Sequence, residues 1–220
     1  MAFGFYNNMQ NYNYWKNRKA SDPKLDWNGE QKSWLDGYVR SVNHPHRDAI
    51  IKELKKLKFD SLLEIGCNTG ANLIKIKDHI GDIDLAGIDA NIEAVKIARY
   101  FLPEFANEIL VGNIERKLPF KNKSYDVVLL DAVLMYVSPE KIFFTLGEIL
   151  RVAKKSIIVI DWNSNCSQFG EIIEFHWTRN YAQIFESLHC KVRKVKITKE
   201  IWPDSKTWQK NGCIFIAQLQ

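Results

Sequence analysis

The strongest structural signal in this chain of 220 residues is the sequence Leu62-Leu63-Glu64-Ile65-Gly66-Cys67-Asn68-Thr69-Gly70. It begins as a buried strand and continues as a turn of small residues that leads into a helix. Because glycine has no Cβ, backbone amides in such a turn can approach a ligand closely. A second strand, residues 85–89, ends in the carboxylate of Asp89, where Rossmann-type sites usually hold ribose hydroxyls. The order strand, glycine turn, helix, strand, acid therefore predicts a cofactor that contains a nucleoside.

Glycine spacing narrows the choice of cofactor. The dinucleotide fingerprint has glycine at its first, third and sixth positions, which here hold Gly66, Asn68 and Ala71. Only Gly66 matches a glycine of that fingerprint. A nicotinamide-dependent oxidoreductase is therefore the less favoured interpretation of the site. The pattern E-x-G-x-N-x-G at residues 64–70 instead resembles motif I of the class I S-adenosylmethionine-dependent methyltransferases, usually written E/D-x-G-x-G-x-G. Asn68 replaces the middle glycine, and asparagine tolerates left-handed backbone geometry better than other non-glycine residues.

The resemblance to this family extends over about residues 55–220, with further motifs in the family's order. They are Gly112-Asn113-Ile114, Leu118-Pro119-Phe120, the stretch from Ser124 to Asp131, and Glu148-Ile149-Leu150-Arg151-Val152. The resemblance implies S-adenosyl-L-methionine as the cofactor. It also implies a Rossmann-like, doubly wound α/β fold, whose seven-stranded sheet is mostly parallel with an antiparallel last strand. The alternation of strands and helices agrees with that fold.

Apolar periodicity and capping residues place the individual elements. Strands are expected at residues 61–65, 85–89, 108–111, 126–130, 156–160, 191–198 and 213–219. Helices are expected at residues 48–57, 92–101 and 178–188, and one more should start at Ser138, with Pro139 in its first turn. We expect a loop containing Trp202, Pro203 and Trp208 between the last two strands.

The chain is expected to divide near residue 46. Residues 1–46 are rich in aromatic and asparagine residues, and we interpret them as an appended segment that covers the cofactor mouth. Its first dozen residues are expected to be mobile. Residues 47–220 form the predicted methyltransferase domain.

Composition disfavours several other classes of protein. The apolar content of 46% is ordinary for a globular domain, and no apolar run reaches the roughly 18 residues that span a membrane. The N-terminus lacks the basic start and apolar core of a secretory signal. The four cysteines are scattered without metal-ligand spacing, and a net charge of +5 is too small to indicate nucleic acid by itself. We therefore expect a cytoplasmic protein without a metal, a membrane or a DNA partner.

The family resemblance implies roles for residues at the strand ends. Asp89 would hold the ribose, and Asn113 with Ile114 would contact the adenine. Asp131 would lie beside the methionine moiety, whose amino-acid end Glu64 would face. The whole predicted cofactor site comprises Trp15, Arg18, Glu64, Gly66, Cys67, Asn68, Gly70, Asp89, Ala90, Asn113, Ile114, Asp131 and Ala132.

Two segments that precede the first predicted helix each have two interpretations: the one that contains Trp15 and Arg18, and residues 44–47. Family members with an aromatic and basic N-terminal segment use it to cover the cofactor, so Arg18 would pair with the methionine carboxylate and Trp15 would lie nearby. A solvent-facing helix explains the same residues. Likewise the sequence His-Pro-His-Arg at residues 44–47 would bind an acidic group of the substrate or simply start a helix.

Two residues are predicted to act on the acceptor. His176 lies where related enzymes build the acceptor pocket and would act as a general base, although a histidine between aromatic residues is often a packing residue. Tyr136 would line the same pocket together with Trp162 and Trp202.

The predicted function is transfer of a methyl group to an oxygen or nitrogen of a small polar acceptor, such as a sugar. The alternative is a catalytically inactive methyltransferase-like module that binds or regulates a partner. Asn68 and Asn113, which depart from the family pattern at cofactor positions, keep this alternative open.

Overall fold

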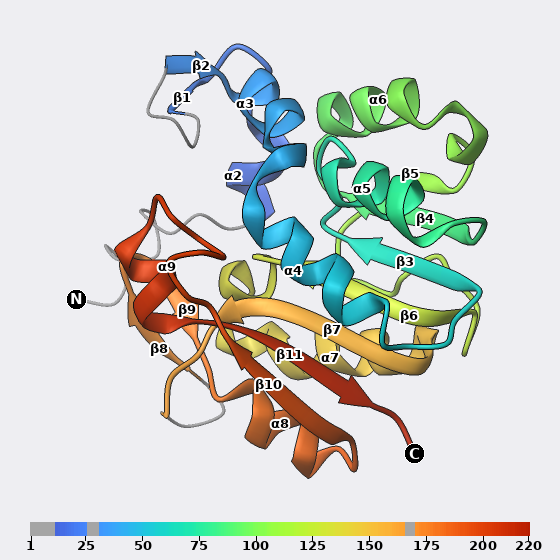
Figure 1. Cartoon of the computed structure of the whole chain (residues 1–220), viewed down its shortest axis with the longest axis vertical. Coiled ribbons are helices and arrows are strands. Elements are labelled where there is room, and N and C mark those ends of the chain that lie inside the picture. Colours follow the sequence, from blue (N-terminus) through green and yellow to red (C-terminus); the bar gives the residue numbers. More distant parts are fainter. Residues whose placement is uncertain (1–11, 26–30, 166–169) are drawn as a thin grey trace.

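The computed structural model describes residues 12–25, 31–165 and 170–220 (Figure 1). A seven-stranded sheet crosses its centre in the order β10-β11-β7-β6-β3-β4-β5. Its strands are β3 (Ser61–Ile65), β4 (Asp84–Asp89), β5 (Ile109–Val111), β6 (Tyr125–Asp131), β7 (Ala153–Trp162), β10 (Lys191–Lys196) and β11 (Gly212–Gln218). The expected mobility of the first dozen residues falls almost entirely outside the described residues.

The sheet is parallel except at one strand. β3 pairs in parallel with β4 on one side and with β6 on the other, and β11 is antiparallel to both β7 and β10. This confirms the predicted fold class, including the antiparallel last strand. The chain moves outward from β3 to β5 and then resumes at β6, on the opposite side of β3. Such a reversal of direction opens a crevice at the carboxyl ends of the strands, where α/β proteins bind ligands.

Helices cover both faces of the sheet (Figure 1). They are α2 (Tyr12–Asn17), α3 (Trp34–Arg40), α4 (Pro45–Leu54), α5 (Ala71–Ile80), α6 (Ile92–Phe101), α7 (Pro139–Val152), α8 (Tyr181–Ser187) and α9 (Lys206–Asn211), with the 3₁₀ turns η1 (Ser41–Asn43), η2 (Pro103–Phe105) and η3 (Leu134–Tyr136). No helix within the described ranges has both the length and the apolar character that crossing a membrane requires.

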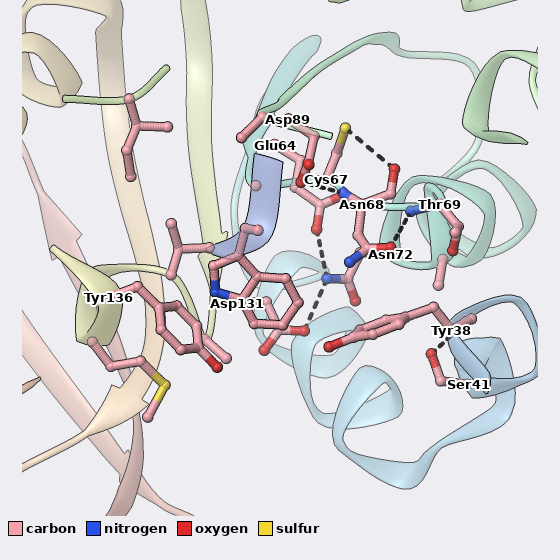
Figure 2. Close-up of a pocket in the computed structure, with 18 of the residues that line it drawn as sticks. Tyr38, Ser41, Glu64, Cys67, Asn68, Thr69, Asn72, Asp89, Asp131 and Tyr136 are labelled. Atoms are coloured by element: carbon pink, nitrogen blue, oxygen red, sulfur yellow. Dashed lines mark hydrogen bonds between the residues drawn. The ribbon is translucent and has the colours of Figure 1, made fainter. Parts of the chain in front are cut away.

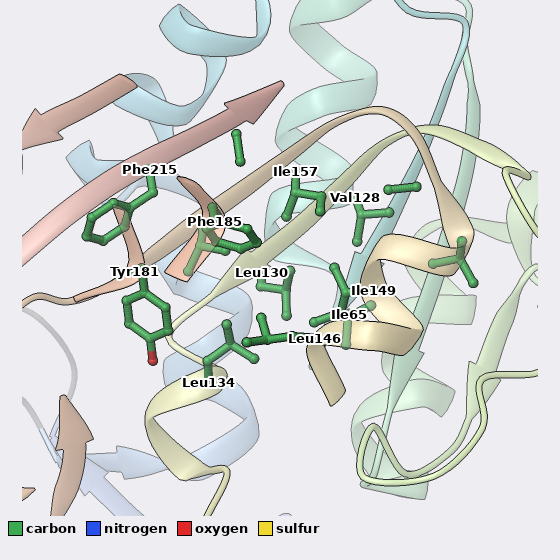
Figure 3. Close-up of a cluster of buried hydrophobic side chains, with 14 of the residues drawn as sticks. Ile65, Val128, Leu130, Leu134, Leu146, Ile149, Ile157, Tyr181, Phe185 and Phe215 are labelled. Atoms are coloured by element: carbon green, nitrogen blue, oxygen red, sulfur yellow. The ribbon is translucent and has the colours of Figure 1, made fainter. Parts of the chain in front are cut away.

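Side chains of the central strands alternate between two apolar cores. In β6, Val128 and Leu130 belong to one core, and Val127 and Leu129 belong to the other, as the two-residue period of a strand requires. Figure 3 shows the first core, in which Leu146 and Ile149 of α7 and Tyr181 and Phe185 of α8 meet the sheet. The helices α4 and α5 bury their apolar residues in the second core. Burial on both faces explains why this strand is apolar throughout.

Two short hairpins supplement the sheet. β1 (Pro23–Leu25) pairs with β2 (Gln31–Ser33), and β8 (Glu171–Ile173) pairs with β9 (His176–Thr178). The prediction of a helix over 178–188 was wrong at its start, because Thr178 pairs with Glu171 and α8 begins at Tyr181. The segment between β10 and β11 was also predicted wrongly as a loop, since α9 occupies part of it and contains Trp208.

The N-terminal elements lie against the rest of the protein. Trp34 and Leu35 of α3 form a small core with Ala94 of α6. The expected division of the chain near residue 46 falls in the first turn of α4, which starts at Pro45, and it stays a prediction.

Candidate functional site

A cavity of about 430 Å³ lies at the carboxyl ends of β3, β4 and β6 (Figure 2), within the range of volumes that hold small molecules and cofactors. Strand ends form one part of its wall, and N-terminal and C-terminal elements form the rest. The predicted site residues that line it are Trp15, Glu64, Gly66, Cys67, Asn68, Asp89, Ala90, Asn113, Ile114, Asp131, Ala132, Tyr136 and His176. Sequence reasoning therefore found residues that the fold brings together.

The turn after β3 has left-handed backbone geometry at three positions. The φ angles are 77° at Gly66, 49° at Asn68 and 80° at Gly70. A Cβ at Gly66 would lie 2.5 Å from Cγ2 of Val133, so this position needs glycine for space as well as for conformation. The side chain of Asn68 folds onto its own turn, where Oδ1 accepts a hydrogen bond from the Thr69 amide at 2.8 Å.

Asp89, at the end of β4, joins this turn to the next one. Its Oδ2 accepts from the Asn68 amide at 2.9 Å, and its Oδ1 accepts from the Asn91 amide at 2.8 Å. Burial raises the pKa of this carboxyl, and the amides of Asn91 and Asn68 oppose the rise. The amide of Ala90 also contacts this carboxylate, which still has acceptor capacity for a ligand, and Asp89 lines the cavity.

A network of buried polar groups occupies the floor of the cavity (Figure 2). The Asn72 amide nitrogen donates to Oε1 of Glu64 at 2.7 Å and to Oδ2 of Asp131 at 3.0 Å. Arg47 donates to the Asn72 side-chain oxygen and, at 3.2 Å, to the same Asp131 oxygen. Within the described part of the chain, Oε2 of Glu64 and Oδ1 of Asp131 are buried and have no hydrogen-bond partner.

The two carboxyl groups of this network differ in their electrostatics. Burial raises the pKa of Glu64 to about 8, against the opposing effects of Asn72 and Arg47. Burial acts in the same direction on Asp131, but His46, Arg47 and Asn72 outweigh it and hold the Asp131 pKa well below its usual range. At neutral pH the Asp131 carboxyl is therefore ionised. The Glu64 carboxyl keeps its proton until a cationic ligand favours its ionised form.

A pair of histidines connects this network to the protein surface. His46 contacts Oδ2 of Asp131 through Nε2 at 2.9 Å and contacts Nδ1 of His44 through its other ring nitrogen. His44 in turn contacts Asp204 at 3.2 Å. Burial lowers the pKa of His46 to about 4, although Asp131 opposes the shift. Since both nitrogens of His46 are engaged, its ring orients Asp131 and has no free nitrogen for a ligand.

Tyr136 and His176 pack edge to face in a separate, aromatic part of the cavity. Their ring centroids are 5.2 Å apart. Burial lowers the pKa of His176, and its buried Nδ1 has no hydrogen-bond partner among the described residues. Burial raises the pKa of Tyr136 well above its usual value, so this phenol keeps its proton at neutral pH and can donate a hydrogen bond.

Buried polar groups fix the 3₁₀ turn η3, which carries Tyr136. Arg179 donates to the carbonyl oxygens of Leu134 and Val137 at 2.9 and 2.6 Å, and Asp161 accepts from the Met135 amide at 3.0 Å. Burial raises the pKa of Asp161 to about 7. The aromatic part of the cavity thus has a rigid support, which joins the end of β7 to the residue that follows β9.

Two of the predicted cofactor residues lie elsewhere. The guanidinium of Arg18 lies over aromatic rings, 5.6 Å from the ring centroid of Trp15 and 5.3 Å from that of Trp34. Gly70 caps α5 and lies against Ala98 of α6. Asn113 lines the cavity as predicted, but its side-chain oxygen already accepts from the Glu115 amide at 2.8 Å, which leaves one lone pair for a ligand.

Sequence reasoning missed the central position of Asn72 and left Arg47 undecided. For the sequence at 44–47, the helix-start interpretation is confirmed because His44 is the N-cap of α4 and accepts from the His46 amide. The same stretch also supplies His46 and Arg47 to the floor of the cavity. For Asn72, the only available signal was its place in the first turn of the helix after motif I.

Comparison with known proteins agrees with this architecture. Residues 62–156 match a family model described as a methyltransferase domain. The fold is similar to that of magnesium protoporphyrin IX methyltransferase from Synechocystis PCC 6803 with bound SAH, at 15% identity and a TM-score of 0.61, covering 87% of this chain and 90% of that one. It is also similar to a SAM-dependent methyltransferase from Aquifex aeolicus, at 19% identity and a TM-score of 0.60, covering 90% of this chain and 100% of that one. No curated protein matches the sequence.

A third similar structure is the complex between the Haloferax volcanii Trm112 methyltransferase activator and the putative methyltransferase, at 18% identity and a TM-score of 0.63, covering 84% of this chain and 95% of the matched one. At such identities the structures establish the fold alone. Residues 62–156 are therefore similar to a methyltransferase domain, and the fold is similar to that of S-adenosylmethionine-dependent methyltransferases.

Proposed function

We propose that the cavity binds S-adenosylmethionine through the predicted strand-end residues and that the enzyme methylates an oxygen or nitrogen of a small polar acceptor. The strongest support is the pair of buried, unpartnered carboxylate oxygens, Oε2 of Glu64 and Oδ1 of Asp131. Buried acceptors without a partner are costly, and an ammonium group such as that of the methionine moiety would satisfy both. The residues present therefore fit this cofactor.

The remaining cofactor contacts follow from the same geometry. Asp89 accepts hydrogen bonds from the ribose hydroxyls with the lone pairs that the turn amides leave open, and Asn113 and Ile114 contact the adenine. Arg47, in place of Arg18, supplies the positive charge opposite the methionine carboxylate. The cofactor can approach the backbone closely because several lining residues are small, namely Gly66, Cys67, Asn68, Ala90 and Ala132. Gly70 lies against Ala98 of α6 and supports the turn there.

The N-terminal segment closes the mouth of the cavity in this proposal. Its described part contributes four residues to the lining, namely Tyr12 and Trp15 of α2, Tyr38 of α3 and Ser41 of η1. The aromatic side chains exclude water from the reacting groups, which strengthens electrostatic interactions there. Arg18 contributes indirectly, by holding the Trp15 ring in place.

The chemistry requires little acid–base machinery. When bound, S-adenosylmethionine supplies a methyl group that its sulfonium already activates. The protein aligns the acceptor, and Nδ1 of His176 takes the proton that a hydroxyl or amine loses on methylation. Tyr136, which stays protonated, donates a hydrogen bond that orients the acceptor. His176 is better suited than His46 to act as a base, because one of its ring nitrogens has no partner within the described structure.

Calorimetric titration with S-adenosylmethionine and its demethylated product, S-adenosylhomocysteine, tests the cofactor assignment. Both should bind, and Asp89→Ala should weaken binding by about 1–3 kcal/mol because ribose hydroxyls lose their acceptor. Asp84→Ala is the matched control, since Asp84 is exposed at the opposite end of the same strand. Unchanged affinity in Asp89→Ala would place the ribose elsewhere. Absence of heat with either ligand would contradict the proposal and favour the inactive module.

A further inference from the structure

An unbroken series of aromatic rings lines one part of the cavity. We call it the aromatic arc and define it as Trp15, Tyr136, His176, Trp162, Trp208 and Trp202, all of which line the cavity. Successive ring centroids are 5.1, 5.2, 5.0, 5.8 and 4.0 Å apart in that order. The last ring, Trp202, also stacks on His46 with centroids 4.4 Å apart, so the arc ends at the polar floor of the cavity.

The arc is more open than ordinary core packing would make it. Trp162 and Trp208 are buried within one of the main apolar cores. Trp15, Tyr136, His176 and Trp202 are only partly buried, and they border the cavity. The stacked pair Trp202 and Trp208, at an interplanar angle of 4°, adds a flat surface. Flat aromatic surfaces of this kind suit a planar ring, because offset stacking and edge-to-face contacts favour another aromatic group.

Polar atoms within the arc indicate which substituents such a ring carries. The indole nitrogens of Trp15 and Trp162, and Nδ1 of His176, are buried without a partner among the residues that the structure describes. An indole N–H can only donate a hydrogen bond. Two unsatisfied donors therefore favour a ligand with oxygen atoms that accept, and Nδ1 of His176 suits a hydroxyl that donates.

The surroundings of the arc disfavour a cationic amine and a sugar as the acceptor. Asp204, at the rim, is paired with His44, and Oδ2 of Asp131 is paired with His46 and Arg47. The unpartnered oxygens of Glu64 and Asp131 are assigned to the cofactor ammonium in the proposed function. The arc itself contains, among the described residues, no carboxylate that would favour a cationic amine. A sugar would need alternating donors and acceptors for its many hydroxyls, and the arc presents mainly ring surface.

We infer that the acceptor is a planar aromatic molecule bearing an oxygen substituent, bound against the aromatic arc with a hydroxyl group toward His176. This inference rests on the proposed function and narrows its acceptor from small polar molecules in general to one chemical class. Trp162 is then a specificity-determining residue, because its N–H recognises the oxygen while its ring contacts the ligand.

The test compares four small probes on the protein, with and without saturating S-adenosylhomocysteine. They are catechol, its saturated analogue cyclohexane-1,2-diol, benzylamine and methyl glucoside, and binding is followed by calorimetry and by quenching of tryptophan fluorescence. Catechol should bind at least tenfold more tightly than each of the others, because only it combines a flat aromatic face with oxygen atoms. Equal affinity for catechol and cyclohexane-1,2-diol, or a preference for benzylamine or methyl glucoside, would overturn the inference.

Substitutions then locate the probe on the arc. Trp162→Phe keeps a ring but removes the N–H, so it should weaken catechol about five- to tenfold. Trp15→Phe provides the same comparison at the other donor if the first variant fails to fold. The control is Trp177→Phe, since Trp177 lies on the same strand as His176 but packs under the Arg179 guanidinium. Catechol affinity that is unchanged in both arc variants would contradict the assignment.

The two proposals fail in different ways in this experiment. If S-adenosylhomocysteine does not bind, the proposed function is wrong, and the probe preference can still be measured on the free protein. If S-adenosylhomocysteine binds but catechol has no advantage, the cofactor assignment stands and the aromatic acceptor is wrong.

Discussion

The half of the cavity that we propose for the cofactor, called the cofactor half below, and the aromatic half differ in the interactions that hold them together. The cofactor half is a network of buried polar groups, in which Asn72 and Asp131 each have several partners. The aromatic half consists of rings that contact one another through apolar surface. The stability of a buried polar network depends on every member, because each lost partner leaves a buried group unsatisfied. The stability of ring packing is instead the sum of many weak attractions. One half is therefore suited to a fixed cofactor, and the other can vary with the acceptor.

Stability measurements provide the strongest test of this contrast. Asp131→Ala removes the counter-charge of Arg47 and the hydrogen-bond partner of His46 within a buried network. Leaving a buried cation uncompensated should lower the free energy of unfolding by about 3–5 kcal/mol. In the aromatic half, Trp202→Leu removes a partly exposed ring and should cost only about 1–2 kcal/mol. Urea denaturation of both variants measures the difference, and a larger loss in Trp202→Leu would break the comparison.

Glu64 links the stability of the cofactor half to its function. Folding raises the pKa of this carboxyl from 4.5 to about 8 because it is buried. Between these values the folded protein retains a proton that the unfolded chain has released, so stability falls as pH rises from about 4.5 to 8. The ionised form is the one that pairs with an ammonium group. Affinity for S-adenosylhomocysteine should therefore increase as pH rises toward 8, while the free protein becomes less stable.

Glu64→Gln should separate these two effects. The amide cannot ionise, so the variant should be more stable than the parent at pH 8.5 and little changed at pH 5, as thermal unfolding would show. Its affinity for S-adenosylhomocysteine at pH 8.5 should be about 10- to 100-fold weaker because a charged hydrogen bond is lost. Glu108→Gln is the control, since Glu108 is exposed before β5. A variant that keeps the pH dependence of the parent would assign the titration to another group.

The same contrast explains what the sequence could predict. The strand-end residues were identified because motif I and Asp89 lie at positions that the parallel sheet brings together wherever this fold occurs. Arg47 and Asn72 were harder, because a helix start gives no sign of which side chains it turns toward a cavity. The sequence therefore predicted which strand-end residues gather at the cavity, but it did not predict the hydrogen bonds between them.

The aromatic half was harder still, because its supports carry weak local signals. The hairpin β8–β9 turns through Glu174 and Phe175, whose φ angles are 46° and 67°. Such a turn usually contains glycine or asparagine, so nothing in the sequence marked a hairpin ahead of His176. The helix α9 spans only Lys206–Asn211, too short for apolar periodicity to reveal. The sequence could suggest individual residues of the arc as parts of a pocket. Only the structure shows that their rings form one continuous series.

Asn68 is the point at which the smallest effect is expected. Asn68→Gly would introduce the glycine of the motif that residues 64–70 resemble, at a φ of 49°, and would relieve backbone strain. It would also remove the hydrogen bond to the Thr69 amide and give the unfolded chain more freedom. Because these terms oppose each other, stability should change by less than about 1 kcal/mol, and calorimetry should find affinity for S-adenosylhomocysteine within about threefold of the parent. An increase above tenfold would show instead that Asn68 weakens cofactor binding, as expected for a module that has lost its activity.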